Sequence, residues 1–291
     1  MPLRRGNRLR AISARTSGST GGAILDKVGA ATVAYSTRRV RTAYTGSALR
    51  VRRSSDNVEQ DIGFTSSGDL NTSSLTSFIG ANSAFVVTWY DQSGNGRDAT
   101  MATTANQPRI VNAGSVDVIN TRPVLIFDGV NDRLALAAAS LTLAPPFTRF
   151  ITAQYLSKTS KSVLFDSETS TEPVVFYNGE SAGQFVSTTG VSPSTVAVNI
   201  GTSNLNFNVF AHLIGSSTID PYTNGTLQTS AGSQGNSLKG LSIGNIRTQL
   251  DNTYSFNGAV AEVILLPSSV ASGTRSLVER NSGAYYGITV A

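Results

Sequence analysis

The sequence of 291 residues contains no cysteine, and His212 is its only histidine. The lack of cysteine excludes disulfide bonds and thiolate metal sites. With a single histidine, neither a catalytic triad nor a zinc site is expected. No phosphate-binding loop or dinucleotide motif is present. No apolar run reaches the ~18 residues that a membrane-spanning helix needs, so no contact with a membrane is expected.

Charged residues are also scarce, at 14% of the chain, while serine, threonine, glycine and asparagine are abundant. This composition is typical of extracellular or virion β proteins. The basic N-terminus is not followed by the apolar stretch of a secretory signal. We therefore expect a virion protein, made in the host cytoplasm without a signal peptide and released by lysis, as in a bacteriophage.

The net charge of +5 is unevenly distributed along the chain. Residues 1–53 hold twelve Lys and Arg against one acid, and the remainder holds eleven against seventeen. Residues 1–22 predict an extended arm, and residues 23–291 a single β domain. The arm has no aromatic residue for base stacking, so nucleic acid is not the expected partner. We expect it to anchor on other virion proteins or on copies of the chain, the alternative being a disordered tail. The anchoring residues are Arg4, Arg5, Arg8, Arg10 and Arg15.

Residues 85–100 combine a strand-like run with a glycine-rich loop and contain the only tryptophan, Trp89. Strict alternation would place Phe85, Val87 and Trp89 on one face of a central strand. In the loop, Asp91, Asn95 and Asp98 carry side-chain oxygen atoms, with Ser93 between the first two. These three residues are candidate calcium ligands. The alternative is Asx turns that satisfy the loop's own backbone, and no other cofactor is expected.

The rest of the sequence predicts mostly short strands. Helices are expected over residues 23–44, residues 70–79 and residues 274–286, because apolar residues recur there at helical spacing. From residue 147 onward, short apolar segments alternate with turns, including a predicted strand over residues 195–200. The Asn224-Gly225 pair predicts a tight hairpin. Residues 256–266 predict a last core strand.

Several segments resemble the catalytic domain of the α-L-arabinofuranosidase B family. They are Tyr35–Arg38, Val51–Asp56 and, above all, the loop motif Tyr90–Gly96. The segment around Phe127-Asp128-Gly129, with Asp132, is similar to concanavalin A-like and laminin G-like domains. The resemblance implies an all-β, concanavalin A-like jelly-roll sandwich with a few short helices. Asp128 and Asp132 are either metal ligands or caps of their turn. The candidate carbohydrate-binding residues are Asp91, Asn95, Tyr177 and Asn178.

The resembled family uses a glutamate nucleophile and an aspartate acid/base. The family's aspartate follows a strand that resembles Leu241–Gly244, and Ile246 stands at that position here. The segment most like the nucleophile strand, residues 183–187, carries no carboxylate, and Glu262 suggests a structural role. We therefore expect no catalytic residue and a non-enzymatic structural or adhesive virion component, such as a capsid decoration, head fibre or tail protein, that binds host-surface glycans. The alternatives are a glycoside hydrolase that uses other carboxylates, such as Glu172 and Glu180, or a soluble lectin.

Overall fold

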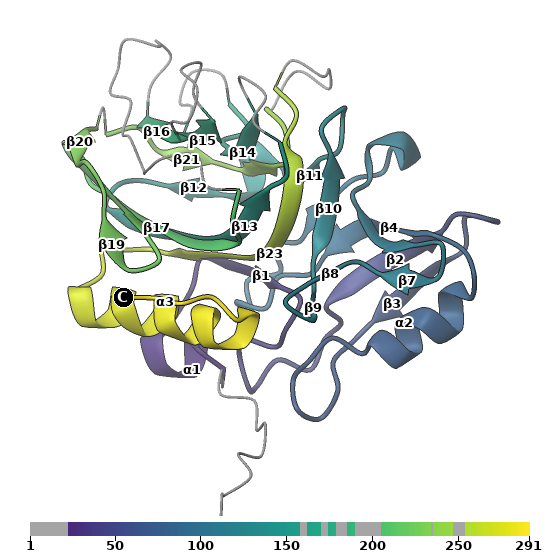
Figure 1. Cartoon of the computed structure of the whole chain (residues 1–291). Coiled ribbons are helices and arrows are strands. Elements are labelled where there is room, and N and C mark those ends of the chain that lie inside the picture. The colour runs from purple at the N-terminus through teal and green to yellow at the C-terminus, as the bar shows by residue number, and fades with distance from the viewer. Residues whose placement is uncertain are drawn as a thin grey trace, which may run out of the picture.

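The computed structural model describes residues 23–157, 162–169, 174–178, 185–189, 205–233, 235–246 and 254–291. These residues form two packed layers of β-strands, with helices on the outside (Figure 1). The predicted jelly-roll sandwich with a few short helices is confirmed. The predicted arm at residues 1–22 and the predicted strand at residues 195–200 lie outside the described residues. No helix in the described ranges is long and apolar enough to cross a membrane.

One layer is built around β23 (Asn257–Leu266), which pairs with β1 (Val33–Ser36) and β10 (Leu125–Asp128) on one edge and with β13 (Phe147–Tyr155) on the other. The layer continues from β13 through β17 (Asn208–Ile214) to β18 (Thr218–Thr223). All but the first residue of β23 are buried, because helices cover one face of the layer and the second layer covers the other. The predicted last core strand is therefore confirmed.

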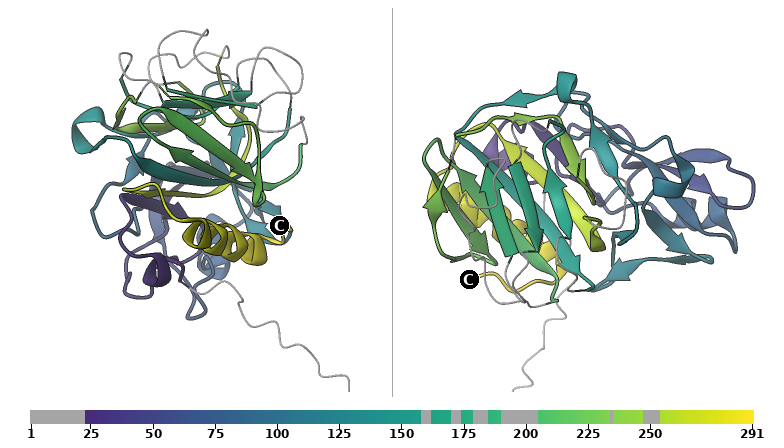
Figure 2. Two further views of the ribbon diagram at one scale, coloured as in Figure 1. Left: turned by 90° about the vertical axis from the view of Figure 1, so that its left-hand side faces the viewer. Right: turned by 90° about the horizontal axis from the view of Figure 1, so that it is seen from above.

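The second layer runs through five strands in the order β16, β15, β14, β22 and β11, and Figure 2 shows it stacked above the first. It continues through β5 into an N-terminal lobe of β4, β2 and β3. The bounds are β16 (Phe185–Thr189), β15 (Val174–Asn178), β14 (Val163–Asp166), β22 (Leu241–Ile243), β11 (Leu134–Leu136), β5 (Ala99–Thr100), β4 (Ala84–Trp89), β2 (Leu49–Arg53) and β3 (Glu59–Ile62).

The remaining elements are short. They are η1 (Thr104–Asn106), β6 (Arg109–Asn112), β7 (Ser115–Val116), β8 (Val118–Ile119), β9 (Arg122–Pro123), η2 (Ala138–Ser140), β12 (Thr142–Leu143), β19 (Thr226–Leu227), β20 (Ala231–Gly232) and β21 (Leu238–Lys239). Among them β6 pairs with both β4 and β10, so it joins the N-terminal lobe to the first layer.

Two of the three expected helices are found close to their predicted bounds. The C-terminal helix α3 (Ser272–Tyr286) lies beneath β13 and β17. Helix α2 (Thr72–Ile79) begins after Asn71, whose side chain accepts a hydrogen bond from the backbone N–H of Ser74.

The helix expected over residues 23–44 is wrong over most of its length. Only α1 (Leu25–Val28) forms, and Gly29 follows it with a φ of 88°. The next apolar residues then form β1, all of whose residues are buried and paired with β23. Tertiary pairing therefore overrides the helical spacing of the sequence.

Strand β4 is central, as expected, because it pairs with β2 on one edge and with β5 and β6 on the other. The expected alternation of its faces is wrong. A register shift pairs Arg50 with Thr88 but Val51 with Val86, so Val87 is an extra residue. Consequently Val86 and Trp89, three positions apart, both join the main core, while Phe85 and Val87 are only partly buried.

Glycine is required at two turns, of which the turn at Asn224-Gly225 was predicted. Asn224 and Gly225 both have positive φ, 50° and 85°, and join β18 to β19, so the hairpin prediction is confirmed. Gly244 has a φ of 92°, and a Cβ atom there would collide with the ring of Phe127. This close approach holds the end of β22 against the turn that follows β10.

Candidate functional site

The glycine-rich loop after β4 is organised by the buried carboxylate of Asp91. Its Oδ1 accepts backbone N–H groups of Ala34 and Ser93, both at 2.9 Å. Its Oδ2 accepts the Ser93 hydroxyl at 2.6 Å and the Arg97 N–H at 3.1 Å. Both carboxylate oxygens therefore hold the loop's own backbone and tie the loop to β1.

Asn95 and Asp98 lie in the same loop as Asp91. The Nδ2 of Asn95 donates to the carbonyls of Ala31 and Thr32, and the Asp98 Oδ1 accepts the Asp91 N–H at 2.8 Å. Burial, and then the negative charge of Asp91, raise the pKa of Asp98. Within the described part of the chain, no group of three or more histidine or carboxylate side chains is arranged around a metal position. The calcium site remains a prediction.

The four candidate carbohydrate-binding residues belong to two elements, with Asp91 and Asn95 in the loop after β4. Tyr177 and Asn178 belong to β15, and their strand partners are Val186 and Phe185 of β16, not the Asp91 loop. The arginines of the arm lie outside the described residues, as do Glu172 and Glu180. These assignments remain predictions.

A pocket of about 400 Å³ opens where β4, β6 and β10 meet. It contains two carboxylates, Asp128 and Asp132, together with the guanidinium group of Arg109. The rest of its lining is polar apart from an alanine, an isoleucine and one aromatic ring. The lining residues are Ser83, Phe85, Thr104, Ala105, Gln107, Arg109, Asn112, Ile126, Asp128 and Asp132.

The two carboxylates of this pocket cap one turn from its two ends. The backbone N–H of Asp128 donates to Oδ2 of Asp132 at 2.9 Å. The N–H groups of Val130 and Asn131 donate to Oδ1 of Asp128 at 2.8 and 3.3 Å. The interpretation of both residues as turn caps is therefore confirmed. One oxygen of each, Oδ1 of Asp132 and Oδ2 of Asp128, has no hydrogen-bond partner among the described residues.

Asp132 is the unusual acid of the pair. Its side chain is buried, with 6% of the residue exposed, whereas Asp128 is exposed. Burial, and then the negative charge of Asp128, raise the pKa of Asp132 to about 7. A carboxyl group with this pKa carries a proton at neutral pH for an appreciable fraction of the time, as a general acid must.

The sequence indicates that Asp128 and Asp132 are turn residues, but it predicts neither the pocket nor the raised pKa of Asp132. Both depend on residues that are distant in sequence, such as Phe85 of β4 and Arg109 of β6. The one available signal was the pairing of two aspartates across a short turn at the end of a predicted buried strand.

The shifted pKa predicts how stability depends on pH. The folded protein holds the Asp132 proton up to about pH 7, whereas the unfolded chain releases it near its ordinary pKa of 3.8. The contribution of this proton to stability is therefore present below pH 4 and lost as the pH rises to 7, roughly 4 kcal/mol in total. Asp132→Asn should remove this dependence. Urea melts of both proteins at pH 5 and pH 8 measure it, and equal pH dependence in the two would contradict the shift.

A second polar cluster lies at the end of β22. The guanidinium of Arg133 pairs with Glu168, and its Nε donates to the hydroxyl of Ser242 at 2.9 Å. The Ser242 hydroxyl in turn donates to the carbonyl of Asn245 at 2.7 Å. Ile246 follows directly, and its N–H donates to the Asn245 side chain. Ile246 stands where the resembled family has its acid/base aspartate. Through Arg133 and Ser242, Glu168 is a further carboxylate linked to this end of β22.

Comparison with known proteins finds likenesses to arabinofuranosidases. A family model of the catalytic domain of α-L-arabinofuranosidase B matches residues 26–126. An arabinofuranosidase complexed with arabinofuranosyl-α-1,2-xylobiose matches with a TM-score of 0.68 and 16% identity, and a GH54 α-L-arabinofuranosidase with a cyclic sulfate inhibitor matches with 0.62 and 15%. Each match covers 90% of this chain and 64% of the arabinofuranosidase chain. No curated protein sequence matches the chain.

These matches correct the expectation that the chain is not an enzyme. The family model is that of a hydrolase's catalytic domain, and the structural matches are to arabinofuranosidases. The expectation rested on Ile246 and on one strand without a carboxylate. Single positions taken from a sequence comparison do not exclude catalysis, because carboxylates from other segments, including Asp128, Asp132 and Glu168, lie in the same β domain.

Proposed function

We propose that the chain is a glycoside hydrolase that acts on α-L-arabinofuranosides. The observation that carries the proposal is Asp132, a carboxyl group with a pKa of about 7 in an open pocket beside a second carboxylate. Glycosidases of most families need such a pair, with one member protonated and the other ionised. The substrate class follows from the likeness to the arabinofuranosidases.

In the proposed reaction Asp132 is the proton donor. Its Oδ2 is held by the backbone N–H of Asp128, so the proton resides on Oδ1, which has no other partner among the described residues. That proton passes to the glycosidic oxygen as its bond to the anomeric carbon breaks. Asp128, whose Oδ2 is unengaged, supplies the negative charge that stabilises the oxocarbenium-like transition state. Water completes the hydrolysis and returns a proton to Asp132.

Other residues of the pocket are suited to holding a sugar. Arg109 uses its Nε and one terminal nitrogen to bind Asp117, at 2.9 and 3.1 Å, which leaves Nη1 without a partner in the described structure. Phe85 presents an aromatic surface, and Arg52 packs over its ring at 5.0 Å. Such a combination of an aromatic ring with donors and acceptors matches the amphipathic surface of a sugar.

The proposal is tested by measuring release of 4-nitrophenol from a panel of 4-nitrophenyl glycosides. We expect turnover of the α-L-arabinofuranoside and much slower turnover of pyranosides such as the β-D-glucoside and β-D-xyloside. Lack of turnover of every member of the panel between pH 4 and pH 8 would overturn the proposal.

We also propose a location for this activity, a bacteriophage particle on which the domain meets host-surface glycans. The support is the uneven charge, with twelve Lys and Arg against one acid in residues 1–53 and an excess of acids beyond them. Arginine pairs well with carboxylates on a partner protein or on another copy of the chain. Deleting residues 1–22 should abolish attachment in pull-downs of purified particles, and retained attachment would contradict this location.

A further inference from the structure

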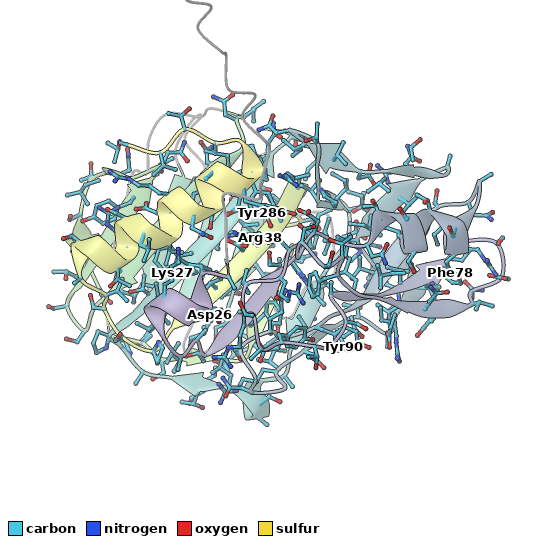
Figure 3. All side chains as sticks on the ribbon, turned by 90° about the horizontal axis from the view of Figure 1, so that it is seen from below. Asp26, Lys27, Arg38, Phe78, Tyr90 and Tyr286 are labelled. Carbon is cyan, nitrogen blue, oxygen red and sulfur yellow. The ribbon has the colours of Figure 1, made fainter. Side chains whose placement is uncertain are left out.

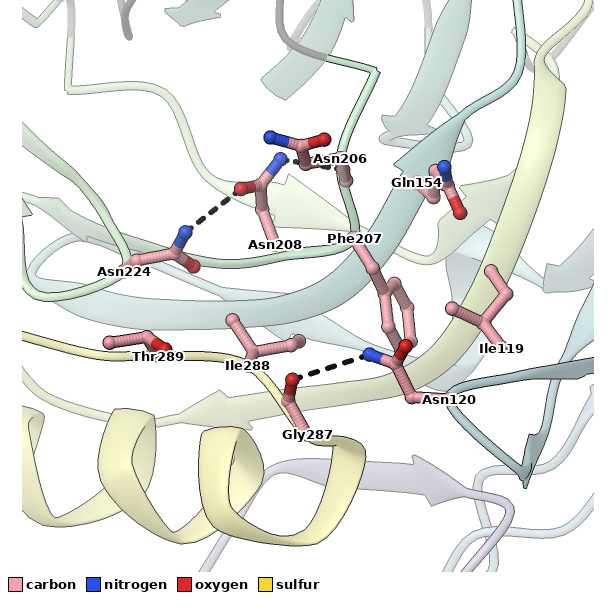
Figure 4. Close-up of a pocket in the computed structure, with 10 residues that line it drawn as sticks. All are labelled: Ile119, Asn120, Gln154, Asn206, Phe207, Asn208, Asn224, Gly287, Ile288 and Thr289. Atoms are coloured by element: carbon pink, nitrogen blue, oxygen red, sulfur yellow. Dashed lines mark hydrogen bonds between the residues drawn. The ribbon is translucent and has the colours of Figure 1, made fainter.

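A second pocket, of about 410 Å³, lies near the C-terminal end of α3. Figure 4 shows Asn206, Asn208 and Asn224 along one side of it and Asn120 and Gln154 on the other. None of the described residues that line it is charged. The apolar part of its lining consists of Ile119, Phe207 and Ile288.

The amide groups of this pocket are held in place by hydrogen bonds to the fold. Asn224 accepts the Val209 N–H at 2.8 Å and donates to Oδ1 of Asn208 at 2.9 Å. Gln154 donates to the carbonyl of Leu205 at 2.5 Å, and Asn120 donates to the carbonyl of Tyr286 at 3.0 Å. The amides are thus fixed before any ligand arrives, which lowers the entropic cost of binding.

The same bonds leave part of three of these amides, those of Gln154, Asn120 and Asn224, unused. Oε1 of Gln154 and Oδ1 of Asn120 accept no hydrogen bond in the described structure, and one hydrogen on Nδ2 of Asn224 is also unused. The hydroxyl of Thr289 at the rim is exposed and makes no hydrogen bond there. Two acceptors, one donor and one hydroxyl therefore surround an apolar floor.

We propose that this pocket binds a neutral saccharide unit, separately from the site of hydrolysis. A sugar ring combines hydroxyl edges, which match the fixed amides, with C–H faces, which match Ile119, Phe207 and Ile288. The absence of charge from the described lining disfavours phosphorylated and acidic sugars, which would lose hydration without gaining an ion pair. The volume falls in the range of ligand pockets and suits one or two sugar units.

Saturation-transfer NMR with L-arabinose, D-xylose and xylotriose tests the proposal. Asp132→Asn serves as the background so that no probe is consumed, which makes this result independent of the proposed activity. In that background, Thr289→Trp should fill the pocket, because the side chain of Thr289 makes no hydrogen bond that the fold needs. Gln154→Leu should remove the unused acceptor and weaken binding about tenfold. Leu277→Trp, at an exposed position of α3 outside the pocket, is the matched control.

We expect saturation transfer from the Asp132→Asn protein to at least one neutral sugar. Transfer should persist in the Leu277→Trp control and be lost in Thr289→Trp. Glucuronate and N-acetylglycinamide, as an acidic sugar and a peptide analogue, should give no comparable transfer. Equal transfer in Thr289→Trp, no transfer to any neutral sugar, or stronger transfer to the peptide analogue would overturn the proposal.

Discussion

Asp132→Asn is expected to slow hydrolysis of a methyl α-L-arabinofuranoside by about 10²- to 10⁴-fold, the usual contribution of a general acid. The 4-nitrophenyl arabinofuranoside should be affected far less, because 4-nitrophenolate leaves without protonation. The substitution keeps an oxygen that accepts the Asp128 N–H, so the turn is retained. Initial rates with the two substrates measure the difference.

Two further variants show whether a loss of activity in Asp132→Asn is specific to Asp132. Asp61→Asn changes an exposed carboxylate that pairs with Arg50 and is not among the pocket's lining residues, so it should leave both rates unchanged. Glu168→Gln tests the cluster at the end of β22. If it abolishes turnover while Asp132→Asn does not, the assignment of Asp132 is wrong although the hydrolase proposal stands. An equal loss on both substrates in Asp132→Asn would also contradict a role in protonating the leaving group.

Glu262→Gln is expected to lower the free energy of unfolding by about 3–5 kcal/mol. Oε2 of Glu262 accepts Nε of Arg38 and the hydroxyl of Ser36, both at 2.8 Å, and Oε1 accepts a second Arg38 nitrogen at 3.0 Å and the Ser282 hydroxyl at 2.6 Å. The side chains of Arg38 and Glu262 are buried, with 1% and 2% of their surface exposed. In Glu262→Gln, an amide nitrogen in place of either carboxylate oxygen would face hydrogen-bond donors. The buried guanidinium of Arg38 would also lose its counter-charge.

This network joins three parts of the fold. Arg38 follows β1, Glu262 lies on β23, and Ser282 lies on α3, where Figure 3 shows Arg38 beside Tyr286. Urea melts measure the loss, with Asp61→Asn as the control, since its exposed pair should contribute less than about 1 kcal/mol. A loss below about 1 kcal/mol for Glu262→Gln would show that the network does not hold β1, β23 and α3 together.

The sequence was sufficient to predict the features that depend on local patterns. The Asn224-Gly225 hairpin, the strand of β23 and the helix α3 all follow from turn chemistry or periodicity within about fifteen residues. The structural interpretation of Glu262 is likewise confirmed by its pairing with Arg38.

Features that depend on distant residues could not be predicted. The segment after Gly29 forms a strand because β23 is available to pair with it, more than 200 residues away. The extra residue at Val87 reflects the register of β2 against β4. The pKa of Asp132 depends on burial by strands that the sequence does not place beside it. The candidate site is therefore a product of tertiary structure, and no motif marks it.

The most direct test of the central claim is kcat/KM for 4-nitrophenyl α-L-arabinofuranoside and its alkyl counterpart between pH 4 and pH 9. A hydrolase that uses Asp132 as its acid should turn over both substrates, and the alkyl substrate should lose activity as the pH rises through about 7, where Asp132 gives up its proton. Turnover of neither substrate would contradict the proposed activity. Turnover without a decline near pH 7 would contradict the role of Asp132.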